Sequence, residues 1–166
     1  MSSVNYDPKK AHEYYEKHKK LKGRRSIKGM NQTQKEQWAY AKSQLSEQHK
    51  EINSNISETA KSDKATVTEN AKERRAEITK MVSEKVERLR NALKNMSLEQ
   101  KKLMKDRIRG MISDVREMAK KDKANITEKS KNLKAEISDI AKTDRADEKE
   151  KYQKRLDAAH KKIRGN

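Results

Sequence analysis

The chain has 166 residues and a formal net charge of +17, with 42% charged and 31% hydrophobic residues. It contains one Trp, five Tyr and no Phe, which leaves too few large apolar side chains to fill a thick globular core. The absence of cysteine excludes disulfides, thiolate zinc sites and cysteine nucleophiles.

Low hydrophobicity combined with a high net charge is also typical of disordered chains. A single Pro, only four Gly and a sustained helical period argue for helices instead. We therefore predict an all-α fold whose apolar side chains are buried along narrow seams between helices. Residues 1–30 form one predicted domain and residues 31–166 the other.

The first predicted domain is a basic helix followed by a linker. Asp7 and Pro8 are typical of a helix start, with Asp as the N-cap and Pro in the first turn. A helix from residue 8 to about 22 is expected to end at Gly23, because glycine favours the backbone geometry of a helix C-terminus. The stretch 23–29 is then a basic linker.

This basic segment is a candidate binding site. Residues 1–30 carry nine basic and three acidic side chains, a net charge of +6, with tyrosines among them. Three interpretations remain open: phosphate contacts with base stacking, docking on an acidic protein groove, or packing of a capping helix on the rest of the chain. The predicted partner-binding or nucleic-acid-binding residues are Tyr14, Tyr15, Lys17, Lys19, Lys20, Lys22, Arg24 and Arg25.

The second domain is predicted to contain two long helices. No Gly or Pro occurs from Asn31, a suitable N-cap, to Asn95. Ser97 and Gln100 then have the spacing of a capping box, which predicts a second helix that runs to about Ile163. The break between the helices is expected at residues 95–97.

An internal repeat is the most specific feature of the sequence. Residues 56–78 align without gaps on residues 115–137, and 12 of the 23 positions are identical. An 11-residue step lies inside each copy. Eleven residues are three turns of about 3.67 residues, so the apolar stripe stays on one side of a nearly straight helix. Low-complexity drift in a Lys-, Ala- and Glu-rich helix is the alternative explanation.

The two copies are symmetric about the predicted break, which favours an antiparallel coiled-coil-like hairpin. Folding there pairs Ile78 with Val115 and Val67 with Ile126. The predicted helix seam is Ile56, Val67, Ile78, Val82, Met111, Val115, Ile126 and Ile137. The rival arrangement has two helices end to end, with stripes that pair between chains in a homo-oligomer.

The open end of this hairpin is expected to hold a small aromatic core. Trp38 and Tyr40 lie near the start of the first long helix, and Tyr152 and Leu156 lie near the end of the second. Antiparallel packing brings these two stretches together. A core that closes the hairpin is favoured here over a partner site.

The sequence offers no basis for catalysis, and we expect a protein that is not an enzyme and has no cofactor or metal. His12 and His18 are six residues apart, whereas a zinc pair on one helix face needs four. The acidic residues are interspersed with lysines at helical spacing, as solvated ion pairs are. No apolar run approaches the ~20 residues of a membrane span, and no secretory signal begins the chain, so neither a membrane partner nor secretion is expected.

The N-terminal block Tyr6-Asp-Pro-Lys-Lys-Ala-His-Glu-Tyr-Tyr-Glu-Lys-His-Lys-Lys-Leu-Lys-Gly-Arg-Arg-Ser26, followed by Lys-rich helices, resembles small helical proteins of tailed bacteriophages encoded among virion and head-assembly genes. The resemblance implies a viral structural or assembly protein in the host cytoplasm or virion, with a capsid- or portal-type protein as its partner. Many scaffolding proteins are more acidic in their helical middle than this chain is.

Three functions follow as hypotheses. The first is a non-enzymatic structural or virion-assembly protein that binds larger partners. The alternative is sequence-nonspecific nucleic-acid binding through phosphate neutralisation. The third is a regulator that inhibits a nucleic-acid enzyme of the host.

Overall fold

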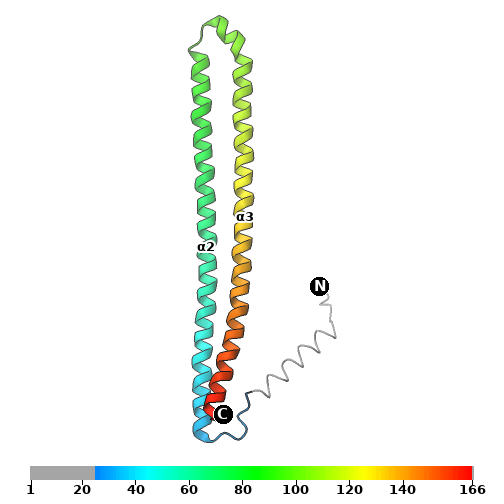
Figure 1. Ribbon diagram of the computed structural model, residues 1–166. Helices are drawn as coiled ribbons and strands as arrows, with labels where there is room; N and C mark the ends of the chain where they lie inside the picture. Colours follow the sequence, from blue (N-terminus) through cyan, green and yellow to red (C-terminus); the bar gives the residue numbers. More distant parts are fainter. Residues whose placement is uncertain (1–24, 166) are drawn as a thin grey trace, which may run out of the picture. The chain divides into compact units, whose positions relative to one another are not determined.

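The computed structural model describes residues 25–165. They contain two α-helices, α2 (Gln32–Lys94) and α3 (Leu98–Arg164), and no strand occurs within this range. The helices pack against each other as an antiparallel hairpin (Figure 1), so the all-α prediction is confirmed. The predicted helix over residues 8–22 lies outside the described residues, as do the predicted binding residues from Tyr14 to Arg24.

Both helix starts lie where the sequence places them. The backbone N–H of Gln34 donates to the side-chain oxygen of Asn31 at 2.8 Å, and the N–H of Asn31 donates to the Gln34 side chain at 3.0 Å. This reciprocal pair is a capping box that satisfies two donors at the start of α2. At the start of α3, the hydroxyl of Ser97 accepts from the N–H of Gln100 at 3.3 Å.

Glycine is required at one turn, just before α2. The N–H of Met30 donates to the carbonyl of Ile27 at 3.1 Å, and Gly29 has a φ of +83° at the third position of that turn. A positive φ there is typical of a type II turn and favours glycine, which has no Cβ to clash. The turn places Met30 so that its side chain is buried.

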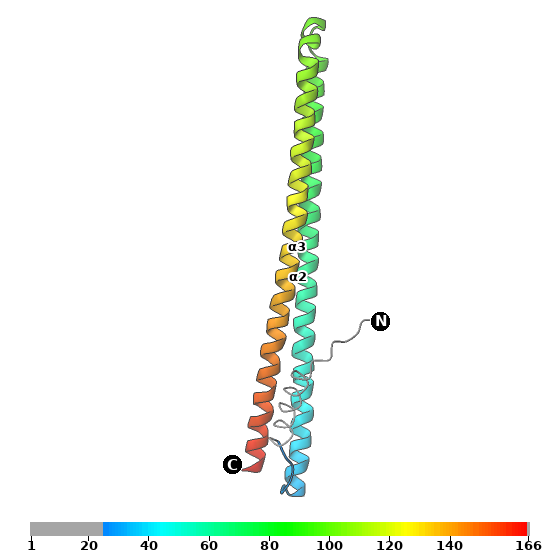
Figure 2. The ribbon, with the colours of Figure 1, turned by 90° about the vertical axis from the view of Figure 1, so that its right-hand side faces the viewer.

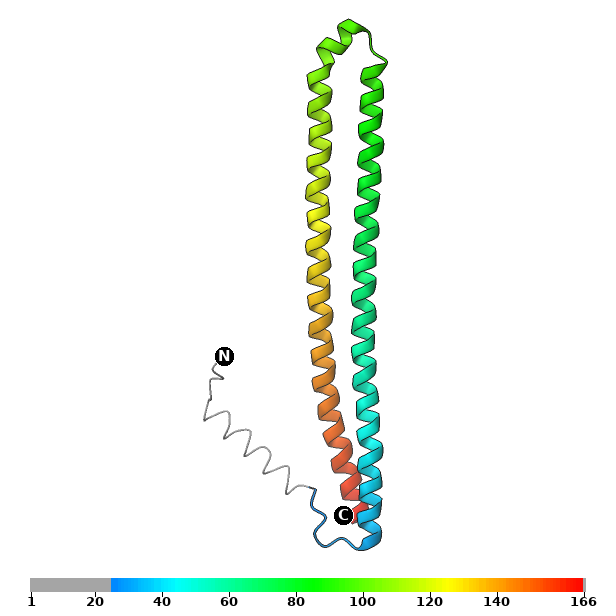
Figure 3. The same cartoon turned by 180° about the vertical axis from the view of Figure 1, so that it is seen from behind.

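The chain divides into two compact units, and each helix contributes to both. We call residues 56–143 the turn unit, because it contains the turn between the helices, and the described residues 25–55 and 144–165 the terminal unit. Within the turn unit, the green and yellow parts of α2 and α3 run side by side in opposite directions (Figure 3).

In the turn unit, the less exposed side chains follow the 11-residue repeat at steps of four, four and three. On α2 they are Ile56, Ala60, Lys64, Val67, Ala71, Arg75, Ile78, Val82, Val86, Leu89 and Leu93. On α3 they are Lys101, Met104, Ile108, Ile112, Val115, Ala119, Lys123, Ile126, Ser130, Lys134, Ile137 and Ala141, together with Ser138, which lies outside these steps. The seam therefore keeps to one side of each helix across successive repeats, as a period of about 3.67 residues requires.

The predicted pairs Ile78 with Val115 and Val67 with Ile126 each line a common depression between the helices. Met111 departs from the prediction, because its side chain is 45% exposed. Its neighbour Ile112 is half-buried and takes the seam position. One residue of helix is about 100° of rotation, which moves Met111 to the edge of the seam.

The terminal unit has an aromatic core. Trp38, Met30 and Leu156 are buried, and Tyr152, Leu45 and Ile163 pack against them. The prediction of Trp38 beside Tyr152 and Leu156 is confirmed, but Tyr40 is 69% exposed and does not take part. Two residues on from Trp38, Tyr40 points to the opposite side of α2. In Figure 2, the blue start of α2 and the red end of α3 lie alongside each other in this unit.

Candidate functional site

A groove of the turn unit lies beside the seam, near the turn between the helices. It encloses about 600 Å³ and takes most of its lining from α3. Its lining residues are Arg90, Leu93, Lys105, Ile108, Arg109, Ile112, Ser113, Arg116, Glu117 and Lys120. Five of these ten are basic and one is acidic, so the groove joins an apolar floor to a cationic rim.

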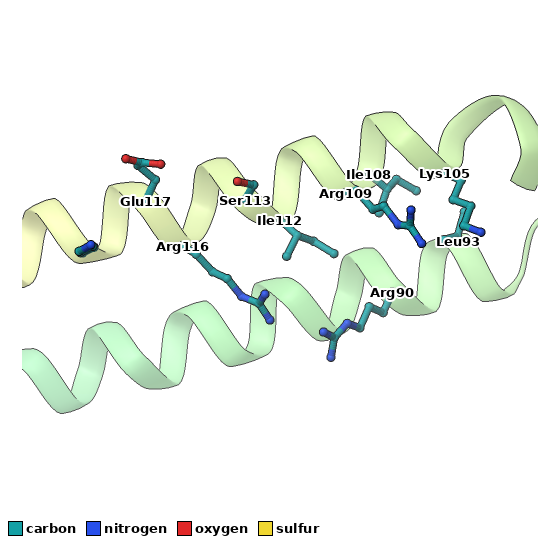
Figure 4. Close-up of a pocket in the computed structure, with 10 residues that line it drawn as sticks. Arg90, Leu93, Lys105, Ile108, Arg109, Ile112, Ser113, Arg116 and Glu117 are labelled. Carbon is teal, nitrogen blue, oxygen red and sulfur yellow. The ribbon is translucent and has the colours of Figure 1, made fainter.

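The close-up in Figure 4 shows how these side chains lie. Ile112 points into the space between the helices, and the side chain of Arg116 extends from α3 toward α2, which carries Arg90. Glu117 points away from α2. Glu117 is thus directed away from Arg90, which comes from α2.

The groove belongs to a larger pattern set by the repeat. Each repeat is counted from its first seam residue, such as Val67 in α2 or Val115 in α3. The second, sixth and ninth residues of a repeat then lie along one edge of the seam, within about 100° of its centre. In the turn unit, 15 of 23 basic residues occupy these positions, and none of the 15 acidic residues does.

We call this edge the cationic face. Its basic residues are Lys61, Lys64, Lys72, Arg75, Arg90, Lys94, Lys101, Lys105, Arg109, Arg116, Lys120, Lys123, Lys131, Lys134 and Lys142. Its other positions hold Ser or Thr, apart from the apolar residues Val86, Leu98 and Ile112. The groove contains five of these basic residues, and Lys94 and Lys101 lie between it and the turn.

A shared groove and a hydrogen bond show that the basic edges of α2 and α3 lie on the same side of the seam. The groove itself joins Arg90 of α2 to Arg116 of α3, both at the second position of a repeat. One repeat or more away, the guanidinium of Arg75 donates to the hydroxyl of Thr127 at 3.1 Å across the helices. The edges therefore face the same way at both places.

The ninth-position cations are anchored differently from the others. Lys64, Lys123 and Lys134 are half-buried, whereas the sixth-position residues Lys61 and Lys72 are exposed. Long basic side chains commonly bury an aliphatic stem while the charged end reaches water. The cationic face thus has an inner row of half-buried cations beside the seam and an outer row of exposed cations.

The terminal unit holds a second polar cluster, centred on Glu148, which is 6% exposed. Its carboxylate accepts from Arg155 and lies 3.3 Å from Nδ1 of His49, whose ring stacks on Tyr152 at 4.2 Å. Burial raises the pKa of Glu148, but hydrogen bonds and charges from Arg155 and His49 outweigh burial, so the pKa lies below its ordinary value of 4.5. The contact between His49 and Glu148 joins α2 to α3 in this unit, whereas Arg155 pairs with Glu148 within α3.

Arg25 is the predicted binding residue that the structure describes. Its guanidinium donates to Asp157 at 3.1 Å and to the side chain of Gln153 at 2.7 Å, and its side chain is 16% exposed. His160 lies nearby, with Nε2 donating to the carbonyl of Ser26 at 2.9 Å and its ring edge-on to Trp38. Arg25 therefore ties the segment before α2 to α3.

Within residues 25–165, no group of three His, Asp or Glu side chains is placed to hold a metal ion. No helix in that same range is long and apolar enough to cross a membrane. No protein-family model matches the chain, and searches of curated proteins and of solved structures gave no match.

The sequence-based reasoning located basic charge at residues 1–30 and missed the cationic face. The signal was present in the repeat, where Ala60-Lys61 and Lys64 recur as Ala71-Lys72 and Arg75. Lys61 and Lys72 lie at the sixth position of their repeats, and Lys64 and Arg75 lie at the ninth. Assigning those lysines to one face required the pairing of the two helices, because one helix alone does not show which edges meet.

Proposed function

We propose that the protein binds double-stranded nucleic acid without sequence preference through the cationic face of its turn unit. The observation that carries this proposal is the separation of charge: 15 basic and no acidic residues along one edge of the seam. A surface of one sign attracts a polyanion and releases its condensed counterions. A face that served only solubility would gain nothing from excluding every carboxylate.

The chemistry of the face favours a duplex over a single strand. Proteins that hold single strands stack the bases on aromatic side chains. The turn unit contains no Trp, Tyr or Phe, so the cationic face offers phosphate contacts without a stacking platform. Lys and Arg on helices suit the outward-facing phosphates of a duplex, whose bases are already stacked.

The spacing of the cations argues against recognition of a particular base sequence in the duplex. Equivalent side chains such as Lys61 and Lys72 are one repeat apart, about 16.5 Å along the helix axis. A duplex presents one negative charge per about 1.7 Å of its axis whatever its sequence, so the attraction of this face to phosphates does not depend on the base sequence. Base edges are the source of direct readout, and nothing on this face is arranged to contact them.

Fluorescence anisotropy with a labelled mixed-sequence duplex, and with a single strand of equal length, tests the proposal. We expect tighter binding of the duplex, affinities that do not change between sequences, and a steep loss of affinity as salt rises. Arg109→Gln/Arg116→Gln should weaken binding, and Arg74→Gln/Arg107→Gln, on the other edge of the seam, is the matched control. Absence of binding at about 50 mM salt, or preference for the single strand, would reject the proposal.

A structural or assembly role is the second candidate, and a separate observation favours it. The turn unit exposes large apolar side chains, among them Met81 at 67% and Met118 at 66%. Exposed apolar surface of this kind is typical of protein interfaces. The bacteriophage origin and the capsid- or portal-type partner rest on the N-terminal resemblance and stay predictions.

A further inference from the structure

The edge of the seam opposite the cationic face carries a repeated depression. One depression lies between Ile78, Met81 and Lys85 of α2 and Val115, Met118 and Asp122 of α3, and it encloses about 300 Å³. A second, of about 140 Å³, is lined by Val67, Asn70, Arg74, Ile126, Lys129 and Leu133. Each residue of the second lies 11 positions from its counterpart in the first, so the two are successive copies of one site.

Large apolar side chains collect on this edge. Met81, Met118 and Ile140 occupy the fourth position of their repeats, and Met111 and Leu133 the eighth. All five are between 45% and 67% exposed. We call this edge the methionine face. Leu98, which is 78% exposed at the start of α3, lies instead at a sixth position.

We propose that the methionine face is the surface on which a second copy of this chain docks, so that the protein associates through its turn units. The depressions recur about every 16.5 Å along the helices. A partner that fills them in turn must place side chains at the same 11-residue period. This chain itself carries that period, on both helices and in both directions.

The charges of the two faces also favour the methionine face as the contact between copies. Fourth- and eighth-position residues include the cations Arg74, Lys85 and Lys129 and the carboxylate Asp122, so the methionine face has both signs. Two copies can align such a surface with opposite charges matched. The cationic face cannot be used in this way, because 15 like charges would be pressed against another 15.

A single hairpin buries little apolar surface, so contact with a second copy can add to its hydrophobic stabilisation. Among the described residues, no side chain is less than 2% exposed, and the seam centre holds small residues such as Ala71 and Ala119. Ala buries far less apolar area than Leu, so one seam contributes little hydrophobic stabilisation. Covering Met81 and Met118 with a second copy would remove substantial apolar surface from water.

The association itself does not rest on the proposed nucleic-acid binding, but its consequence does. Two hairpins joined at their methionine faces turn both cationic faces outward. Each would be open to its own duplex, so the assembly would bridge two segments of nucleic acid.

Sedimentation velocity of the protein alone tests the association. The unmodified chain should form a dimer or larger species at micromolar concentrations. Met81→Gln/Met118→Gln should weaken the association about tenfold or more, since each substitution removes apolar contact. Leu98→Gln, an equally exposed position outside the methionine face, is the control and should leave it unchanged. A chain that stays monomeric, or a double variant that associates as the unmodified chain does, overturns the proposal.

Spin labels identify the face that is used. The chain has no cysteine, so Asn70→Cys on the methionine face and Lys72→Cys on the cationic face each give a single labelling site without removing an apolar contact. Pulsed dipolar spectroscopy should give a shorter distance between labels at 70 than between labels at 72. An equal or longer distance at 70 overturns the proposal. Neither measurement includes nucleic acid, so failure of the duplex-binding proposal would not alter their results.

Discussion

The terminal unit and the turn unit are built from the same two helices but stabilised in different ways. The terminal unit uses single, non-repeated contacts: Trp38 against Leu156, and Glu148 between Arg155 and His49. The turn unit repeats one 11-residue pattern, with Ala at its seam and Lys at its edge. Specific side chains fix the register in the first, whereas the second presents the same chemistry many times along its length.

The largest expected difference between the units concerns their apolar contacts. Leu156→Ala should destabilise the terminal unit by about 2–5 kcal/mol, because it leaves a cavity beside Trp38. Leu103→Ala in the turn unit should change stability by about 0.5 kcal/mol or less, since Leu103 is 81% exposed. Denaturant unfolding followed by fluorescence of Trp38 and by circular dichroism measures both. Equal effects of the two substitutions would contradict the expected difference in apolar packing between Leu156 and Leu103.

The buried carboxylate predicts a pH dependence that belongs to the terminal unit. The pKa of Glu148 is lowered in the fold, so its contribution to stability is complete above its ordinary value of 4.5 and is lost as pH falls below that value. Glu148→Gln should cost about 1.5–3 kcal/mol at pH 7, because hydrogen bonds to charged groups are lost.

The measurement is the unfolding midpoint by Trp38 fluorescence between pH 7 and about pH 3, where the gap between the natural chain and Glu148→Gln should close. Glu150→Gln is the matched control, since its pair with Lys154 is exposed and should contribute little. A gap that stays constant as pH falls would show that Glu148 is not the responsible group.

A smaller effect distinguishes the two sides of the helices in the turn unit. Ala71 is 6% exposed at the seam, so Ala71→Leu should force the helices apart and cost about 1–3 kcal/mol. Ala76→Leu, at an exposed position of the same helix, should be close to neutral. Thermal unfolding by circular dichroism compares them. Tolerance of leucine at both positions would contradict close packing at the seam.

Much of the fold follows from local signals in the sequence. Asn31 and Ser97 cap the two helices where their spacing to Gln34 and Gln100 predicts. The symmetry of the repeat about the turn favoured the antiparallel pairing over end-to-end helices, because folding the chain at residues 95–97 brings both stripes together within one chain. Met111 and Tyr40 were misplaced, since an error of one or two residues rotates a side chain away from the seam.

The candidate site was less predictable. A net charge of +17 does not say where the charge gathers, and residues 1–30 drew attention by their composition. The lysines of the repeat lie between carboxylates in the sequence, so they read as solvated ion pairs. The carboxylates fall outside the second, sixth and ninth positions of the repeat, and the pairing of α2 and α3 shows that these positions of both helices share one edge. The Glu148 cluster likewise joins His49 to residues far away in the chain.

The central claim is that the position of the charges, and not their number, makes the turn unit a duplex-binding surface. Its most direct test is the salt dependence of duplex binding for two variants that each remove four positive charges from the +17 of the chain. One is Lys61→Gln/Lys72→Gln/Lys120→Gln/Lys131→Gln on the cationic face. The other is Arg74→Gln/Lys85→Gln/Arg107→Gln/Lys129→Gln on the methionine face.

The slope of log affinity against log salt should become shallower by about 3–4 for the cationic-face variant, at about 0.9 per lost phosphate contact. The slope for the methionine-face variant should stay near that of the natural chain. Equal changes in both variants would mean that net charge alone governs binding, and the cationic face would lose its assigned role.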